Sequence, residues 1–298
     1  MSIFFIVIIA SNARLAAAGS ASVIASSSAR GVICQDRPHL SLHQPQALSW
    51  PPLPTIAFRR TDMDSTPKLI PAKDLAARAM RAFPNDSDAY RKARIALLAE
   101  EIELRRHITR VAAQRRALPL GGKAKAYRFR DDQGKELGLA DLFGRHDTLV
   151  TYAWMYGPER ERPCPMCTSF LGSLDVPSVD IRQRVAFAIL GRSPVARQLA
   201  FARERGWRNL AFYEIVGDDF SRDYRVLAAD GSEWAALDVW VRKGADVHHF
   251  WAAETTMEMA DPGQDPHLAP EPAPLWTILD LTPGGRGTDW YPKLSYEA

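Results

Sequence analysis

The chain has 298 residues, 46% of them hydrophobic and 24% charged, which is ordinary for a globular protein. Its net charge is +3, and residues 1–63 hold five arginines, two aspartates and no lysine, which leaves 33 basic and 33 acidic residues for 64–298. This neutral balance lacks the basic excess of a nucleic-acid-binding domain, so no nucleic-acid partner is expected.

Residues 1–63 differ from the rest of the chain. The apolar run Phe4 to Ala10 is far shorter than the ~20 residues of a membrane-spanning helix, so no membrane partner is expected. Serine-, alanine- and then proline-rich sequence follows, without a helical or strand period. We expect a disordered leader or a wrongly assigned start, with Met63 as the working start. A secreted protein with a signal peptide is the alternative, but no Lys or Arg precedes the apolar run.

Residues 64–122 are predicted to be a helical segment. Within it, residues 86–118 carry an apolar stripe at three- and four-residue steps, formed by Tyr90, Ala93, Leu97, Leu104, Ile108 and Val111. Asp86 or Ser87 can cap the start of this helix, and Pro119 ends it. We expect the stripe to pack within the protein, with a dimerisation arm as the alternative.

From Lys123 the pattern changes to extended segments rich in β-branched and aromatic residues. The first expected elements are a short strand around Tyr127 and Phe129, a turn at 132–134, a second extended piece and the buried strand HDTLVTYAWMYG. A strand at 185–190 and a helix started by Ser193, with Pro194 in its first position, come next. The strand NLAFYEIVG and a hairpin turning at Lys243-Gly244 complete the series. Strands that alternate with helices predict an α/β layer with a partly parallel sheet.

The stretch GPERERPCPMCTSFLG places Cys164 and Cys167 after a buried strand, at the expected start of a helix. Free N–H groups and the partial positive charge at a helix N-terminus stabilise a thiolate. Cys164 would lie nearest that end and be the more exposed, and Cys167 would lie one turn in, within disulfide reach. The charges of Arg160 and Arg162 are expected to lower the thiol pKa further.

Two interpretations of the cysteine pair without redox chemistry stay open. A structural zinc site needs four ligands, and besides the cysteines the chain offers the adjacent His248 and His249 and the isolated His267. Inert buried cysteines are the other possibility. We expect no metal, and no built-in cofactor because no Gly-rich nucleotide fingerprint is present. With Cys34 in the leader, the body has two cysteines only, which favours the cytoplasm.

Several pieces resemble the thioredoxin-like family known as domain of unknown function 899. In order from about Ala89 to the end, they are LLAEEIELRR, RRALP, YRFRDDQGKELGLADLFG, YAWMYGPERERPCPMCTSF, FARERGWRNL, HHFWAAE, PLWTILDLTPGGRG and DWYPKLSY. The resemblance implies a thioredoxin-like fold over 123–298, with a central mixed sheet flanked by helices, a long N-terminal helix and an irregular C-terminal extension. Two departures stand out: Ala236 occupies the place of the thioredoxin cis-proline, and Glu161 that of the peroxiredoxin threonine.

Other residues are candidates for supporting roles. Tyr156 can border the thiols, Thr168 can hydrogen-bond a thiolate, and Arg192 can steady an anion at the end of a parallel strand. His249, Trp251 and Glu254 can line a pocket in which the histidine moves protons, although a structural histidine is the more ordinary role. Trp207 and Trp276 are expected to fill the core.

The sequence favours a thiol–disulfide oxidoreductase or thiol peroxidase with Cys164 as nucleophile and Cys167 as resolving thiol. Its partners would be a small-molecule peroxide or disulfide and a cellular thiol reductant. A redox sensor or binding module without enzymatic activity is the alternative, and a zinc-binding scaffold is a weaker one.

Overall fold

The structure is a computed structural model that describes residues 69–79, 81–253, 259–264, 267–268, 270–287 and 289–296. The expectations for residues 1–63 and for Glu254 lie outside these residues. Contacts divide the chain into Met1–Thr66 and Pro67–Ala298, and every described residue belongs to the second unit. Within the described residues, no helix has the length and apolar character needed to cross a membrane.

Two N-terminal helices, α1 (Ala72–Ala79) and α2 (Asp88–Arg116), pack against each other. α2 confirms the predicted long helix. Ser87 caps it by accepting a hydrogen bond from the Tyr90 backbone N–H at 3.1 Å. The expectation that its apolar stripe packs is wrong for three members, since Tyr90, Leu97 and Leu104 are each more than half exposed. The reason is that α1 covers a different side of α2, the side around Ile102 and Ala99.

A mixed sheet follows, with strand order β2-β1-β5-β4-β3-β6-β7 in the described part of the chain. Strands β3, β4 and β5 are parallel, and the other neighbours are antiparallel. The strands are β1 (Arg128–Arg130), β2 (Glu136–Gly138), β3 (Thr148–Ala153), β4 (Ala186–Gly191), β5 (Phe212–Val216), β6 (Ala236–Lys243) and β7 (Asp246–Ala252). The further helices are the 3-10 helix η1 (Leu139–Phe143), α3 (Pro165–Leu174), α4 (Ser178–Ile181), α5 (Val195–Glu204), α6 (Asp219–Asp223) and α7 (Pro274–Asp280).

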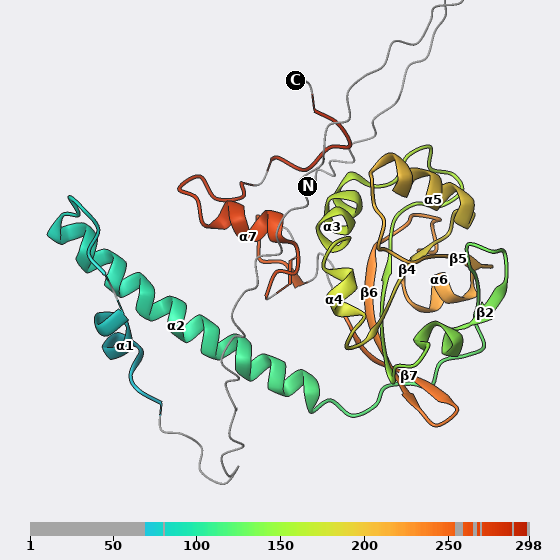
Figure 1. Cartoon of the computed structure of the whole chain (residues 1–298), viewed down its shortest axis with the longest axis horizontal. Coiled ribbons are helices and arrows are strands. Elements are labelled where there is room, and N and C mark those ends of the chain that lie inside the picture. Colours follow the sequence, from blue (N-terminus) through green and yellow to red (C-terminus); the bar gives the residue numbers. More distant parts are fainter. Residues whose placement is uncertain are drawn as a thin grey trace, which may run out of the picture. The chain divides into compact units, whose positions relative to one another are not determined.

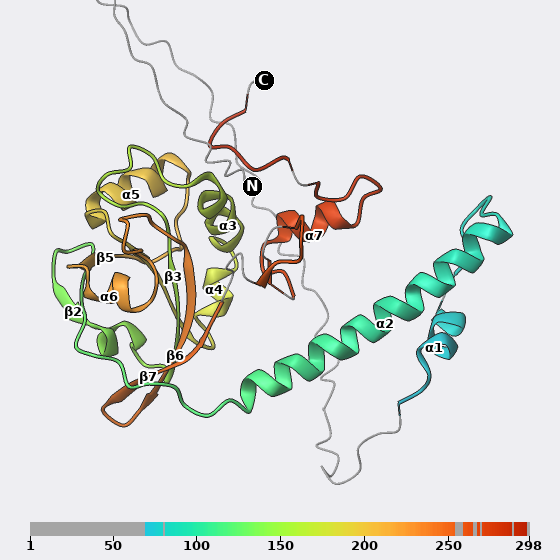
Figure 2. The same cartoon turned by 180° about the vertical axis from the view of Figure 1, so that it is seen from behind.

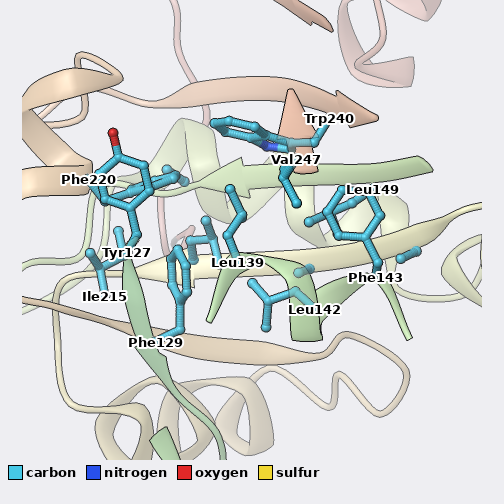
Figure 3. Close-up of a cluster of buried hydrophobic side chains, with 14 of the residues drawn as sticks. Tyr127, Phe129, Leu139, Leu142, Phe143, Leu149, Ile215, Phe220, Trp240 and Val247 are labelled. Carbon is cyan, nitrogen blue, oxygen red and sulfur yellow. The ribbon is translucent and has the colours of Figure 1, made fainter. Parts of the chain in front are cut away.

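The sheet, drawn in Figures 1 and 2, separates two apolar layers. Because side chains alternate along a strand, Leu149 and Ala153 of β3 join one layer, while Tyr152 and Trp154 join the other. The first layer, shown in Figure 3, packs Phe129, Trp240 and their neighbours against η1 and α6. The second packs under α3 and α5 and contains Cys167. The cysteine motif therefore lies on one defined face of the sheet.

The predicted fold class, an α/β protein with a central mixed sheet and a long N-terminal helix, is confirmed. The parallel β3–β4–β5 core, the antiparallel β6–β7 hairpin and the cysteine pair at the start of α3 form a thioredoxin-like arrangement. One boundary differs from expectation. Pro194 has an extended ψ of 137° and is the N-cap of α5, so the helix begins at Val195 and Ser193 lies one residue before the cap.

Candidate active site

Cys164 occupies the N-cap of α3, directly before Pro165 in the first helical position. Its backbone N–H donates to the Met155 carbonyl at 3.0 Å, which joins the start of α3 to the end of β3. Its own carbonyl accepts from the Thr168 N–H and from the Thr168 hydroxyl, both at 2.9 Å. Thr168 is buried and braces the first helical turn through this carbonyl. The strand–motif–helix geometry expected from the sequence is present.

The two thiols have opposite electrostatic environments. The pKa of Cys164 is lowered to about 6, chiefly because the Cys167 thiol donates a hydrogen bond to it, with added help from the backbone N–H groups of Cys167 and Met166 and from the Arg160 charge. Burial opposes this shift. The pKa of Cys167 is raised well above its usual value, because its thiol donates that hydrogen bond and is buried. These opposite shifts favour the thiolate at Cys164 and the thiol at Cys167.

Tyr152 is a site residue that the sequence analysis did not name. Its hydroxyl hydrogen-bonds Cys167, where it lowers the pKa of that thiol, and burial raises the pKa of Tyr152 itself. A chain of hydrogen bonds thus runs from Tyr152 to Cys167 to Cys164. The period-2 alternation of β3 was the available signal, because it places Tyr152 on the side of the sheet that α3 covers.

The loop 157–163 before Cys164 is held by two residues that the sequence did not indicate. Glu233, with a side chain only 9% exposed, accepts from the Gly157 N–H at 3.0 Å and from Arg160 Nε at 2.9 Å. Arg197 lies over the Tyr156 ring and donates to loop carbonyls, including those of Gly157, Pro158, Arg160 and Glu161. A side chain at position 157 would displace the Glu233 carboxylate, since a Cβ there would lie 1.8 Å from a Glu233 oxygen.

The predicted arginines have other partners. Arg162 lies over the Phe201 ring and forms an ion pair with Glu204, so its charge is paired with a carboxylate and not with a thiol. Arg192 binds Glu233 and Asp218, each at 3.0 Å, and so braces the same loop through Glu233. Tyr156 is buried in the apolar layer that holds Cys167.

The predicted histidine group lies elsewhere. His249 Nε2 contacts Asp238 Oδ1 at 3.0 Å, and its ring packs on Trp240, in the layer opposite the cysteines. Burial raises the pKa of Asp238, although His249 acts against this rise. Trp251 lies 5.3 Å beneath the Arg115 guanidinium. The structure therefore does not bring His249 or Trp251 together with the thiols.

A cavity of about 450 Å³, called here the cysteine cavity, is lined in part by Cys164 and Cys167. The body of the protein contributes residues of β3, α3, the start of β6 and the chain just after β3 and β7, namely Tyr152, Met155, Met166, Ser169, Phe170, Trp234, Ala235, Leu237 and Ala253. The rest comes from the C-terminal segment, defined as the described residues between 259 and 296. Its α7 contains no buried residue, and Trp276, expected in the core, lines the cavity instead. Trp207 does pack in the core, stacked on Phe212.

Among the described residues, no three or more His, Cys, Asp or Glu side chains gather as a metal site would require.

The chain matches the family described as "Bacterial protein of unknown function (DUF899)" over residues 80–296. It belongs to this family. The resemblance drawn from the sequence is thus confirmed. A comparison with curated proteins gives no match.

Solved structures with similar folds include a reduced 2-Cys peroxiredoxin from Plasmodium vivax, with 17% identity, 45% of this chain and 82% of that chain covered, and a TM-score of 0.34. A thiol peroxidase from Chromobacterium violaceum shows 16% identity, 45% and 75% coverage, and a TM-score of 0.33. The lipoprotein thioredoxin Etrx1 from Streptococcus pneumoniae shows 12% identity, 45% and 91% coverage, and a TM-score of 0.33.

Proposed function

We propose that this protein is a thiol-dependent oxidoreductase in which Cys164 is the nucleophile and Cys167 the resolving thiol. The observation that carries the proposal is the placement of Cys164, which caps a helix, receives a hydrogen bond from a second thiol and lines a cavity. A thiolate is the reactive form of cysteine, and the lowered pKa of Cys164, about 6, supports one at this position near neutral pH.

With a disulfide substrate RSSR, the Cys164 thiolate attacks one sulfur, the S–S bond breaks and RS⁻ leaves. Cys167 then loses its proton and attacks Cys164 Sγ, which forms the internal disulfide and releases the second RS⁻. Both leaving groups take up protons, so one substrate disulfide is reduced as the protein dithiol is oxidised.

With a hydroperoxide ROOH, the Cys164 thiolate attacks the terminal oxygen, the O–O bond breaks and ROH leaves after taking up a proton. Cys164 is then a sulfenic acid, and Cys167 attacks its sulfur to form the internal disulfide and water. Tyr152, which donates to Cys167, is placed to stabilise charge on that sulfur as it attacks.

In both cases a cellular thiol reductant returns the internal disulfide to two thiols and is itself oxidised to a disulfide. We place this cycle in the cytoplasm, where such reductants keep thiols reduced.

The test is turnover of dipyridyl disulfide and of cumene hydroperoxide with a dithiol reductant in excess. We expect turnover of one or both above the uncatalysed rate, and its loss in Cys164→Ser. Cys34→Ser, which removes the third cysteine of the chain, is the matched control and keeps the activity. If neither compound is turned over while a reversible internal disulfide forms, the protein is a redox switch and the proposal is wrong.

A further inference from the structure

We propose that the substrate is a neutral, apolar organic molecule of aromatic size that carries the reducible S–S or O–O bond, and that the C-terminal segment binds its apolar part. This inference rests on the proposed function, because it assigns to Cys164 the reaction with whatever the cysteine cavity holds.

The size of the cavity is the first argument. Its volume of about 450 Å³ lies within the ~300–1,000 Å³ typical of small-molecule sites. A water molecule has a share of ~30 Å³ in the liquid, so hydrogen peroxide would leave nearly all of this space unused. A molecule with one or two rings uses it.

The lining of the cavity is the second argument. Six aromatic side chains line it, from both the body and the C-terminal segment: Tyr152, Phe170, Trp234, Trp276, Trp290 and Tyr291. Trp276 makes edge-to-face contacts with Trp290 and Tyr291, each with ring centroids 6.3 Å apart. Met155 and Met166, flexible and polarizable, complete the apolar surface near Cys164. Such a lining favours apolar ligands over hydrated ones.

The charges of the lining are the third argument. Arg286 lies over the Trp276 ring and pairs with Asp280 at 2.5 Å and with Glu271 at 3.7 Å. Its positive charge is thus matched by carboxylates of its own segment. A dianionic substrate would have to compete with these carboxylates for Arg286, whereas a neutral one would not.

The C-terminal segment is attached to the body beyond the aromatic residues. Pro292 is buried, Leu294 packs against the apolar layer that contains Cys167, and the Leu294 carbonyl accepts from Arg205 at 2.9 Å. Figures 1 and 2 show α7 on the same side of the sheet as α3. This attachment holds Trp290 and Tyr291 in the wall of the cavity, so the segment is a binding surface for the substrate.

The experiment compares dipyridyl disulfide, which is neutral, with dithiobis(nitrobenzoate), an aromatic dianion. Each rate is divided by the rate of free glutathione with the same compound, so that intrinsic reactivity cancels. We expect the normalised rate to be at least about tenfold higher for the neutral disulfide. Equal normalised rates, or a preference for the dianion, would overturn the inference.

Variants of the wall sharpen this result. Trp276→Ala removes a ring that the core does not need, and we expect the KM for cumene hydroperoxide to rise about tenfold. Leu281→Ala, in the same segment but 76% exposed and outside the lining, is the control and leaves this KM unchanged. A Trp276→Ala variant with unaltered KM would contradict the role of the wall.

Binding without reaction separates this inference from the proposed function. Cumyl alcohol, which has no reducible bond, is added to Cys164→Ser, and tryptophan fluorescence reports binding. We expect saturable binding that Trp276→Ala weakens. Binding without turnover by the native protein would refute the proposed function but keep the apolar site, and turnover without such binding would refute the site alone.

Discussion

The cysteine cavity has an inner wall from β3 and α3 and an outer wall from the C-terminal segment, and the two are built differently. In the inner wall, Tyr152 and Cys167 are buried and fixed by a parallel strand and a helix start. In the outer wall, α7 has no buried residue, and Trp276 is held mainly by other aromatic rings and Arg286. In the account proposed above, regular structure sets the reactivity of the sulfur, while the C-terminal segment selects the molecules that reach it.

The largest effect should come from the inner wall, with Cys167→Ser. We expect turnover to fall by about a hundredfold or more, because only the added reductant can then resolve the mixed disulfide on Cys164, whereas a neighbouring thiol acts at a far higher effective concentration. The first step should survive, so that each chain releases one equivalent of thiol from an aromatic disulfide and keeps the other half as an adduct visible by mass spectrometry. With Cys34 also replaced by serine, release of two equivalents per chain would contradict the assigned roles.

The loop that leads to Cys164 should depend strongly on Glu233. Glu233→Gln removes a largely buried charge that pairs with Arg160 and Arg192. We expect the free energy of unfolding, measured in urea, to fall by about 2 kcal/mol. Glu136→Gln is the control: Glu136 pairs with two arginines at the surface, so its replacement should lower the free energy of unfolding clearly less. Equal losses for both variants would show that Glu233 is an ordinary surface partner.

The pH dependence should follow Cys164. Because its pKa is about 6, the thiolate fraction rises as pH increases through that value. The rate of the first step with neutral dipyridyl disulfide should therefore rise about tenfold between about pH 5 and about pH 7, and then level off. Stopped-flow measurement of pyridinethione release checks this. A rate that keeps rising past pH ~8.5 would indicate an ordinary thiol.

The smallest effect should come from Tyr152→Phe, which keeps the ring and removes the hydroxyl that donates to Cys167. We expect the resolving step to slow about threefold to tenfold, in line with one hydrogen bond of ~1 kcal/mol, and the first step to keep its rate. Rapid-quench measurement of the mixed disulfide separates the steps. A slower first step with an unchanged second one would contradict the proposed chain of hydrogen bonds.

The sequence predicts the inner wall better than the outer one. A buried strand, Cys-x-x-Cys and Pro165 in the first helical turn are local signals, so the partial exposure of Cys164 and the burial of Cys167 follow from neighbours in the chain. Glu233 and Arg197 reach the loop across 76 and 37 residues of sequence, and no periodic pattern marks such a contact. The Gly- and Pro-rich C-terminal segment is equally hard to predict, because its sequence does not show whether its aromatic residues lie in the core or line a cavity.

The central claim is tested most directly by titrating the thiolate of Cys164 through its ultraviolet absorbance in the fully reduced protein, with Cys164→Ser as the blank. We predict one transition near pH 6, absent from the blank and moved to higher pH in Cys167→Ala, which lacks the hydrogen-bond donor. A transition at pH ~8.5 that Cys167→Ala leaves in place would contradict the account.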